Sequence, residues 1–249
     1  MQQQGVNMGI NRAHKTAPVR AVIFDLDDTL WPLLPLITRA EQTLFDWLQQ
    51  HVPAVTRQHS IQSLRAVRAE LLPTNARFEY DLWALRKAVL TRVFTLAGED
   101  LTMIDPAMQI FSHARNQVSL FPDALPVLTQ LGKNFRLGSI SNGFADLAAI
   151  GLAEHFGVSL AAHQFGCAKP DARIFLAACA ALEVEPHQAV YVGDDVLIDV
   201  QGAQQAGLRT VWINRSGKVA PPDLQPDAEC RDLSAVLHWL HQHHTTTSP

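Results

Sequence analysis

Hydrophobic residues change their spacing along the chain, and these changes predict its secondary structure. Residues 19–24 form a short, dense run rich in β-branched side chains, which is typical of a strand covered on both faces in a parallel sheet. From Trp31 to about Leu120 the apolar residues recur at helical spacing, and Pro53 and Pro73 interrupt them. This block therefore predicts roughly four helices and no strand.

Beyond residue 120, short apolar runs alternate with helical stretches. Strands are expected at 135–141, 157–162, 189–194 and 208–213, and helices at 122–131, 144–150, 171–182 and 198–206. Such alternation favours an α/β fold with a doubly wound parallel sheet. Because the first strand belongs to the same sheet, the helical block is an insertion that would cover the core as a lid.

The expected domain boundaries follow from these elements. A Rossmann-type core would comprise residues 19–30 and 121–241, and an α-helical cap would comprise residues 31–120. Residues 1–18 and 242–249 are expected to be disordered tails, because chain ends are poorly ordered unless a strand or helix ties them down.

Composition narrows the classes of partner. The 249 residues carry a formal net charge of -4, without the clustered Lys and Arg that binding to nucleic acid or an anionic membrane requires. The three cysteines are widely spaced, which fits neither a disulfide framework nor paired zinc ligands. No stretch approaches the ~18 apolar residues of a membrane span, and residues 1–18 lack the apolar core of a signal peptide. A cytoplasmic protein with reduced thiols is expected, and the sequence gives no sign of its oligomeric state.

Polar residues follow the predicted strands. In a doubly wound sheet, ligands bind beyond the carboxyl ends of the strands, so these residues should share one rim. They are Asp25, Asp27, Asp28, Thr29, Ser141, Asn142, Gly143, Lys169, Asp194, Asp195 and Asp199. Taken alone, each has a structural explanation: Asp, Asn, Ser, Thr and Gly form turns and helix caps, and a lysine is usually solvated. Their joint occurrence at strand ends favours a shared site.

A divalent cation would account for the clustered acids. Mg²⁺ prefers oxygen ligands and is commonly held by one or two carboxylates, waters and a phosphate oxygen. Side chains two residues apart on an extended segment share one side, so Asp25 and Asp27 could face one ligand about 6.5 to 7 Å apart. That separation leaves space for a phosphorus atom, with Lys169 and the Ser141 hydroxyl beside its oxygens.

The segments "DLDDT", "SISNG", "KP" and "GDDVLID" resemble the four motifs of the haloacid dehalogenase-like (HAD) hydrolase superfamily. The resemblance spans residues 19 to about 214, and the helical insertion lies where that family places an α-helical cap. It implies that Asp25 is a nucleophile that forms an aspartyl-phosphate. It also implies that Asp27 protonates the leaving alkoxide and later deprotonates the attacking water.

The same resemblance implies the remaining roles. Mg²⁺ would be held by Asp25, by the backbone carbonyl of Asp27 and by Asp194, while Asp195 and Asp199 would orient waters or Lys169. Ser141 and Lys169 would grip the phosphoryl group, and Thr29 would shape the loop. Asn142 and Trp31 are further candidates for the substrate side of the site, although Trp31 has the alternative of packing at the hinge.

The acid at position 27 favours a phosphatase over a carbon–halogen hydrolase, because the family's dehalogenases lack an acid there. In detail the motifs resemble bacterial subfamily I members with a helical cap, assigned as FMN or 5-amino-6-(5-phosphoribitylamino)uracil phosphatases. Phosphoglycolate and pyrimidine nucleotide phosphatases share the same plan. The expected substrate is a small phosphorylated metabolite, with FMN or a related compound as the first choice.

Two other classes of function stay open at this point. A response-regulator receiver also combines clustered Asp residues with Lys-Pro, but its Lys-Pro follows all the acids, whereas Lys169 precedes Asp194. A HAD-like protein that binds a ligand without turnover is the second. In the cap, residues 75–92 gather aromatic side chains and arginines that could stack a ring and hold an anionic tail, or could simply form a half-buried helix with a solvated basic face.

Overall fold

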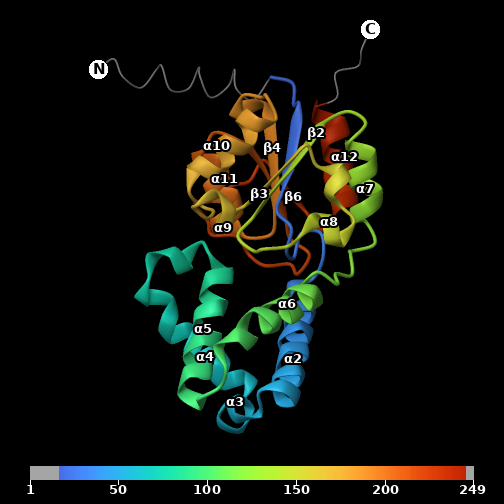
Figure 1. Ribbon diagram of the computed structural model, residues 1–249. Helices are drawn as coiled ribbons and strands as arrows, with labels where there is room; N and C mark the ends of the chain where they lie inside the picture. Colours follow the sequence, from blue (N-terminus) through green and yellow to red (C-terminus); the bar gives the residue numbers. More distant parts are fainter. Residues whose placement is uncertain (1–16, 245–249) are drawn as a thin grey trace, which may run out of the picture.

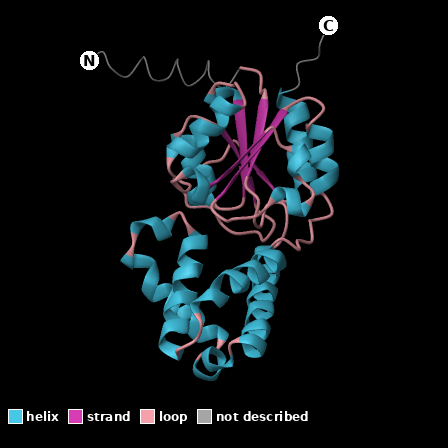
Figure 2. Cartoon of the chain, in the orientation of Figure 1, coloured by secondary structure: helices cyan, strands magenta, loops and turns pink. Residues whose placement is uncertain are grey.

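The computed structural model describes residues 17–244, which form two bodies joined by two crossings of the chain (Figure 1). One body is a sheet with helices on both faces, and the other is built of helices (Figure 2). The expected tails lie mostly outside the described residues. The last helix, however, continues to His244 and so includes the start of the segment expected to be a tail from residue 242.

The sheet is entirely parallel, which confirms the doubly wound α/β prediction. Its strand order is β3-β2-β1-β4-β5-β6, so β1 lies in the centre. The short edge strand β6 was not predicted, because its three residues show no hydrophobic pattern. The strands are β1 (Ala21–Phe24), β2 (Arg136–Ser141), β3 (Val158–Ala161), β4 (Ala189–Gly193), β5 (Arg209–Ile213) and β6 (Ala228–Cys230).

Helices cover the sheet on both sides, with α7, α8 and α12 on one face and α9, α10 and α11 on the other (Figure 1). A π-helical turn, η6, leads from β4 into α11. These helical elements are α7 (Ala124–Leu131), α8 (Leu147–Ile150), α9 (Ala162–Phe165), α10 (Ala172–Ala181), η6 (Val196–Gln201), α11 (Gly202–Gln205) and α12 (Leu233–His244), with short 3-10 turns η4 (Ala153–His155) and η5 (Pro186–Gln188).

Strand β1 is apolar throughout because both of its faces are buried. Val22 and Phe24 pack into the same cluster as Leu128 of α7, while Ile23 points to the opposite face and packs with Phe175 of α10. Successive side chains of a strand alternate between faces, so a strand between two helical layers needs apolar residues at every position. The central strand is thereby fixed, and its carboxyl end has a defined place.

The helical body has an apolar core of its own, which is separate from the two cores that flank the sheet. Between residues 33 and 115, all of them described, no strand occurs. The roughly four expected helices are joined by a fifth short one, α3, which begins at Pro53. The helices are α2 (Leu33–His51), α3 (Pro53–Gln58), α4 (Ile61–Leu71), α5 (Leu82–Ala97) and α6 (Ile104–Arg115), with 3-10 turns η1 (Leu72–Thr74), η2 (Ala76–Glu79) and η3 (Leu101–Met103).

The three cysteines are buried free thiols. Burial raises the pKa of Cys179 to about 12 and that of Cys230 to about 11, so both thiols stay protonated at neutral pH. Among the helices of residues 17–244, none combines the length and the hydrophobicity that crossing a membrane would need.

Candidate active site

A cavity of about 550 Å³ lies between the carboxyl edge of the sheet and the helical body, which we call the cap. Strands β1, β2 and β4 all end at this edge, as the sequence analysis expected for their polar residues. Thr29 and Trp31 are fully buried and do not line the cavity. The other residues singled out for catalysis, substrate or metal do line it: Asp25, Asp27, Ser141, Asn142, Lys169 and Asp194.

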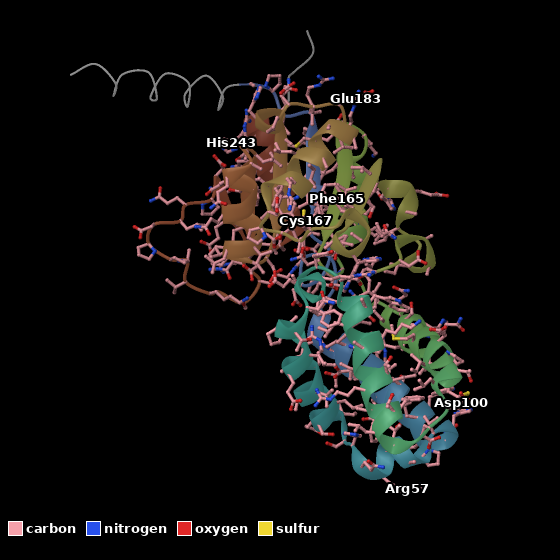
Figure 3. All side chains as sticks on the ribbon, turned by 60° about the vertical axis from the view of Figure 1, so that its left-hand side comes forward. Arg57, Asp100, Phe165, Cys167, Glu183 and His243 are labelled. Carbon is pink, nitrogen blue, oxygen red and sulfur yellow. The ribbon has the colours of Figure 1, made fainter. Side chains whose placement is uncertain are left out.

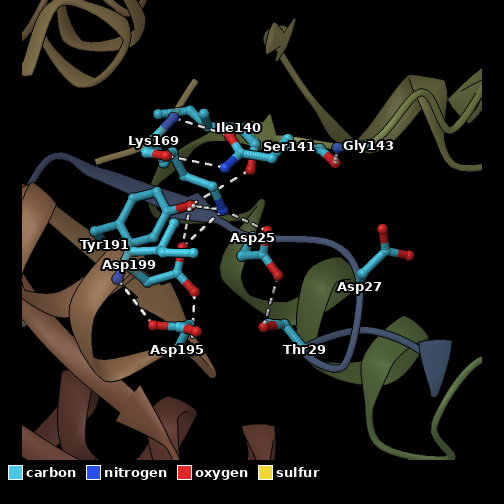
Figure 4. Close-up of polar contacts among 12 residues, drawn as sticks. Asp25, Asp27, Thr29, Ile140, Ser141, Gly143, Lys169, Tyr191, Asp195 and Asp199 are labelled. Carbon is cyan, nitrogen blue, oxygen red and sulfur yellow. Dashed lines mark hydrogen bonds and ion pairs between the residues drawn. The ribbon is translucent and has the colours of Figure 1, made fainter. Parts of the chain in front are cut away.

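Lys169 is the centre of a buried ionic network (Figure 4). Its Nζ donates hydrogen bonds to Asp25 Oδ1 at 2.5 Å, to Asp199 Oδ1 at 2.7 Å and to the Tyr191 hydroxyl at 2.9 Å. These contacts use all three protons of the ammonium group. The lysine is therefore rigidly placed beside Asp25, and it is not the solvated surface lysine that the alternative explanation required.

Burial and charge oppose each other in this network. Burial raises the pKa of Asp25 well above its usual value, and the adjacent ammonium of Lys169 only partly offsets that effect. Burial alone would lower the pKa of Lys169, but the carboxylates of Asp199 and Asp25 outweigh it and raise the pKa well above its usual value. Lys169 is thus a permanent positive charge next to Asp25.

Asn142 and Gly143 fix the loops around the network. The Asn142 side chain donates to the Lys169 carbonyl at 3.0 Å and accepts from the Lys169 backbone N–H at 2.8 Å. The Ser141 Oγ accepts from the Gly143 N–H at 2.9 Å. A Cβ on Gly143 would lie 3.0 Å from Asp27 Oδ2, so glycine allows this loop to approach the acid closely. The Ser-Asn-Gly turn therefore has a structural role and also borders the cavity.

Asp27 stands apart from the lysine network (Figure 4). Its carboxylate accepts hydrogen bonds from the Trp31 indole N–H at 2.8 Å and from Arg115 Nη2 at 2.7 and 2.8 Å. Trp31 therefore supports Asp27 from the buried side. Thr29, likewise buried, donates its hydroxyl to Asp25 Oδ2 at 3.3 Å.

Arg115, the last residue of α6, was not among the predicted site residues. Its side chain is 3 % exposed and crosses from the cap to the core to reach Asp27. A signal was present: Arg115 continues the buried stripe of Ile104, Met108 and Phe111, where apolar residues recur every three to four positions. An arginine on an apolar stripe is a candidate for a buried ion pair. Tyr191, the other residue that was missed, gives no such signal within its apolar strand.

Three carboxylates come together as a group that could hold a metal ion. Asp25, Asp194 and Asp199 each offer an oxygen, and these oxygens lie within 4.8 Å of one another. Asp199 thus belongs both to this group and to the Lys169 network. The Asp199 carboxylate lies so close to the backbone of residue 193 that only glycine leaves room for it. A Cβ on Gly193 would lie 2.4 Å from Asp199 Oδ2. The Asp27 side chain is not part of the group, and the resemblance had assigned only its backbone carbonyl to the metal.

Burial and neighbouring residues affect the ionisation of Asp194 and the position of Asp199. Burial, followed by the negative charge of Asp199, raises the pKa of Asp194 to about 7. Asp195 caps η6, where its Oδ1 accepts from two backbone N–H groups, and its own N–H donates to Asp199 Oδ2 at 3.0 Å. The all-oxygen donor set is the kind that Mg²⁺ and other hard divalent cations prefer, so the residues present fit such an ion.

Residues 19–207 match the family model of the haloacid dehalogenase-like hydrolases. The chain belongs to this family. Among its HAD-like relatives, the 5-amino-6-(5-phospho-D-ribitylamino)uracil phosphatase YigB of Escherichia coli (strain K12) is 31% identical, over 78% of this chain and 83% of the relative. The glyceraldehyde 3-phosphate phosphatase of Methanopyrus kandleri is 30% identical, over 86% and 92%.

A solved HAD-like structure, the 2-haloacid dehalogenase from Pseudomonas syringae pv. Tomato DC3000, is 39% identical and superposes with a TM-score of 0.85. It covers 90% of this chain and 99% of its own. The likeness includes the cap, since the overlap extends over nearly the whole of both chains.

The aromatic and basic segment of this HAD-like cap, residues 75–92, does not form a stacking platform in the cavity. Of its three arginines only Arg86 lines the cavity, while Arg77 and Arg92 form ion pairs elsewhere on the cap. Trp83 packs against the cap core. The structure therefore favours the half-buried helix over a ring-binding face.

Proposed function

We propose that this protein is a Mg²⁺-dependent phosphatase that hydrolyses a small phosphate monoester through an aspartyl-phosphate on Asp25. Its curated relatives are phosphatases, and the chain is a phosphoric monoester hydrolase of the HAD-like family. The observation that carries the mechanism is the buried Asp25–Lys169 pair at the cavity, with a second acid, Asp27, held separately on the same loop.

In the first step, an Asp25 oxygen attacks phosphorus and the ester P–O bond breaks. Lys169, ionised by its carboxylate partners, stabilises negative charge on the transferring phosphoryl group. The leaving alkoxide takes its proton from Asp27. In the second step, Asp27 accepts a proton from water, the resulting hydroxide attacks phosphorus, and the bond to Asp25 breaks. Trp31 and Arg115 hold the Asp27 carboxylate in one orientation throughout.

The group of Asp25 and Asp194, together with the Asp27 backbone carbonyl, would hold the cation. When bound, Mg²⁺ supplies positive charge to the phosphate oxygens and helps to align them with the nucleophile. Carboxylates whose pKa is raised by burial and by mutual repulsion, as for Asp194, become easier to ionise beside a dication. The three crowded oxygens support this assignment.

A carbon–halogen hydrolase is the second candidate, because the structural relative of 39% identity carries the name of a 2-haloacid dehalogenase. A halide leaves without a proton, so that reaction needs no acid two residues beyond the nucleophile. This chain has Asp27 there, with two side chains dedicated to orienting it. We therefore favour phosphate monoesters, with FMN, phosphoglycolate and nucleotide monophosphates as compounds to test.

The metal requirement has a direct test. Purified protein is assayed for phosphate release from a panel of monoesters with Mg²⁺ and with excess EDTA. We expect release with Mg²⁺, loss with EDTA and recovery when Mg²⁺ is added back, since the carboxylate group needs a cation beside it. Release that is indifferent to EDTA, or halide release from 2-haloacids without phosphatase activity, would contradict the proposal.

Two substrates whose leaving groups differ in their need for a proton test the role of Asp27 as an acid. Asp27→Asn is expected to lower kcat/KM for an alkyl phosphate by roughly 10²- to 10⁴-fold, because the alkoxide then leaves without a proton. For p-nitrophenyl phosphate, whose leaving group needs no proton, the loss should be much smaller. The ratio kcat/KM includes only steps up to formation of the aspartyl-phosphate, so it isolates the acid from the later base. Asp46→Asn, on the exposed side of α2, is the control, and equal losses for both substrates would argue against an acid role.

A further inference from the structure

Arginines of the cap line the same cavity as the carboxylates of the core. Arg65 and Arg68 lie three residues apart on α4 and so share one face of the helix, and Arg86 comes from α5. All three line the same cavity as Asp25 and Lys169. Among the described cap residues around this cavity, Glu41 of α2 is the only acid. These cap residues therefore carry more positive than negative charge.

Glu41 interacts with two of these arginines but hydrogen-bonds to only one of them. Arg65 donates to Glu41 Oε2 from Nε at 2.8 Å and from Nη2 at 2.5 Å, whereas Arg86 Nη2 lies 4.0 Å from Glu41 Oε1, beyond hydrogen-bond distance. The Arg68 side chain has no hydrogen bond or ion pair within residues 17–244. Burial lowers the pKa of Arg86 to about 10; the charge of Glu41 opposes this shift, and the nearby charge of Arg68 adds to it. Two neighbouring guanidinium groups that share a single acid, one of them without an ion pair, repel each other unless a further anion is present.

Arg86 is fixed in place, and its ion pair with Glu41 is long, at 4.0 Å. Its guanidinium carbon lies 3.4 Å from the centre of the Phe111 ring, in a cation–π contact that holds the plane of the group. The Nε atom is buried and has no acceptor among the described residues. Native proteins rarely keep a buried donor without a partner unless it has a role. A rigid guanidinium that makes no hydrogen bond to its nearest acid is suited to the bidentate recognition of a carboxylate or phosphate.

Apolar side chains line the cavity as well: Leu33, Ile37, Leu82 and Phe144. A molecule that fills the cavity would thus meet Lys169 and the carboxylates of the core, apolar surface and the guanidinium groups of the cap. We propose that Arg68 and Arg86, with Arg65 beside them, bind a second anionic group of the substrate, a carboxylate or a second phosphate, remote from the phosphate that is cleaved. This inference rests on the proposed phosphatase function and adds its substrate class.

The test uses pairs of phosphates that differ only in the remote group. Glyceraldehyde 3-phosphate and 3-phosphoglycerate share one carbon skeleton, with an aldehyde or a carboxylate at the far end. ω-Hydroxyalkyl phosphates, ω-carboxyalkyl phosphates and alkanediol bisphosphates of increasing length extend the comparison and separate carboxylate from phosphate. We expect the wild-type protein to prefer the anionic member of each pair at its best length by roughly tenfold or more in kcat/KM.

Arg68→Gln is the decisive variant, because Arg68 has no partner in residues 17–244 that its loss would leave unpaired. It should reduce the preference for the anionic tail by about tenfold, through KM, while kcat/KM for the neutral-tail member changes by less than about twofold. Arg86→Gln should act in the same direction, and Arg86→Lys should retain part of the preference. Arg57→Gln, at the far end of the cap (Figure 3), is the matched control and should leave the preference intact.

Measurements of binding test the preference for an anionic tail without any turnover of the substrate. Titration calorimetry with glyceraldehyde 3-phosphate and 3-phosphoglycerate on Asp25→Asn, with and without Arg68→Gln, reads the preference without hydrolysis. A carboxylate preference that disappears with Arg68→Gln supports the inference even if the phosphatase assay fails. Equal binding and equal kcat/KM within every pair, or an Arg68→Gln loss that is the same for neutral and anionic tails, would overturn it.

Discussion

Replacing Asp25 with Asn is expected to abolish phosphate release, by at least about 10³-fold in kcat, because an amide cannot attack phosphorus as a carboxylate does. The fold should survive. Burial raises the pKa of Asp25, which means that the folded protein favours the neutral form of this group, and Asn is neutral. Lys169 keeps Asp199 as its partner. In EDTA, the variant should therefore melt within a few degrees of the wild type.

Intact mass spectrometry makes this expectation specific. Wild-type protein quenched in acid during turnover should show a fraction heavier by one phosphoryl group, and Asp25→Asn should show none. Asp46→Asn, an exposed acid of the cap, serves as the matched control and should keep both activity and labelling. Full activity in Asp25→Asn, or a phosphoryl group that maps to another residue, would remove Asp25 as the nucleophile.

Lys169→Met is expected to have the largest effect on stability. It removes the only cation from a buried group and leaves the carboxylates of Asp25 and Asp199 facing each other. Removing one partner of a buried ion pair typically costs about 3 to 5 kcal/mol. We expect a loss of that order in the free energy of unfolding, measured with denaturant in EDTA, and a loss of phosphate release as well.

The dependence on pH distinguishes this explanation from a simple packing defect. Burial raises the pKa of Asp25, and without Lys169 the ammonium that partly offsets this effect is gone, so the folded state favours the protonated form of Asp25 more strongly. The destabilisation should therefore be smaller at pH 5 and larger at pH 8. Adding Asp199→Asn to Lys169→Met should restore part of the stability. Lys133→Met, at an exposed lysine, is the control. A loss independent of pH and unchanged in the double variant would indicate packing alone.

Much of the fold was predictable because its central strands are buried on both faces. The predicted strands at 19–24 and 189–194 are recognisable by their consecutive apolar residues, and they lie in the sheet as β1 (Ala21–Phe24) and β4 (Ala189–Gly193). The predicted helix at 144–150 is shorter in the structure, where α8 begins after Asp146 because that side chain caps the backbone of Ala148 and Ala149. Local capping chemistry of this kind competes with hydrophobic periodicity and is hard to rank from sequence.

The candidate site was predictable as far as strand ends could place it. Asp25 and Asp194 follow β1 and β4, Ser141 is the last residue of β2, and the topology of parallel strands brings such residues to one edge. Arg115 was not predictable in the same way, because its contact with Asp27 depends on how the cap is oriented on the core. Hydrophobic patterns specify which face of a helix is buried, but not which residue of another body lies opposite.

The insertion of the cap after the first strand also sets the order in which a growing chain can fold. Helices α2 to α6 form a continuous segment with its own apolar core, so it can fold once residue 115 has been synthesised. Strand β1, made before it, must wait: Val22 pairs with Leu137 and Val190, far later in the chain. Pairings over such sequence separations form slowly, because a long loop must close first. On the ribosome, the cap can therefore be complete while β1 is still without its neighbouring strands, and the apolar side chains of β1 are open to aggregation during that interval.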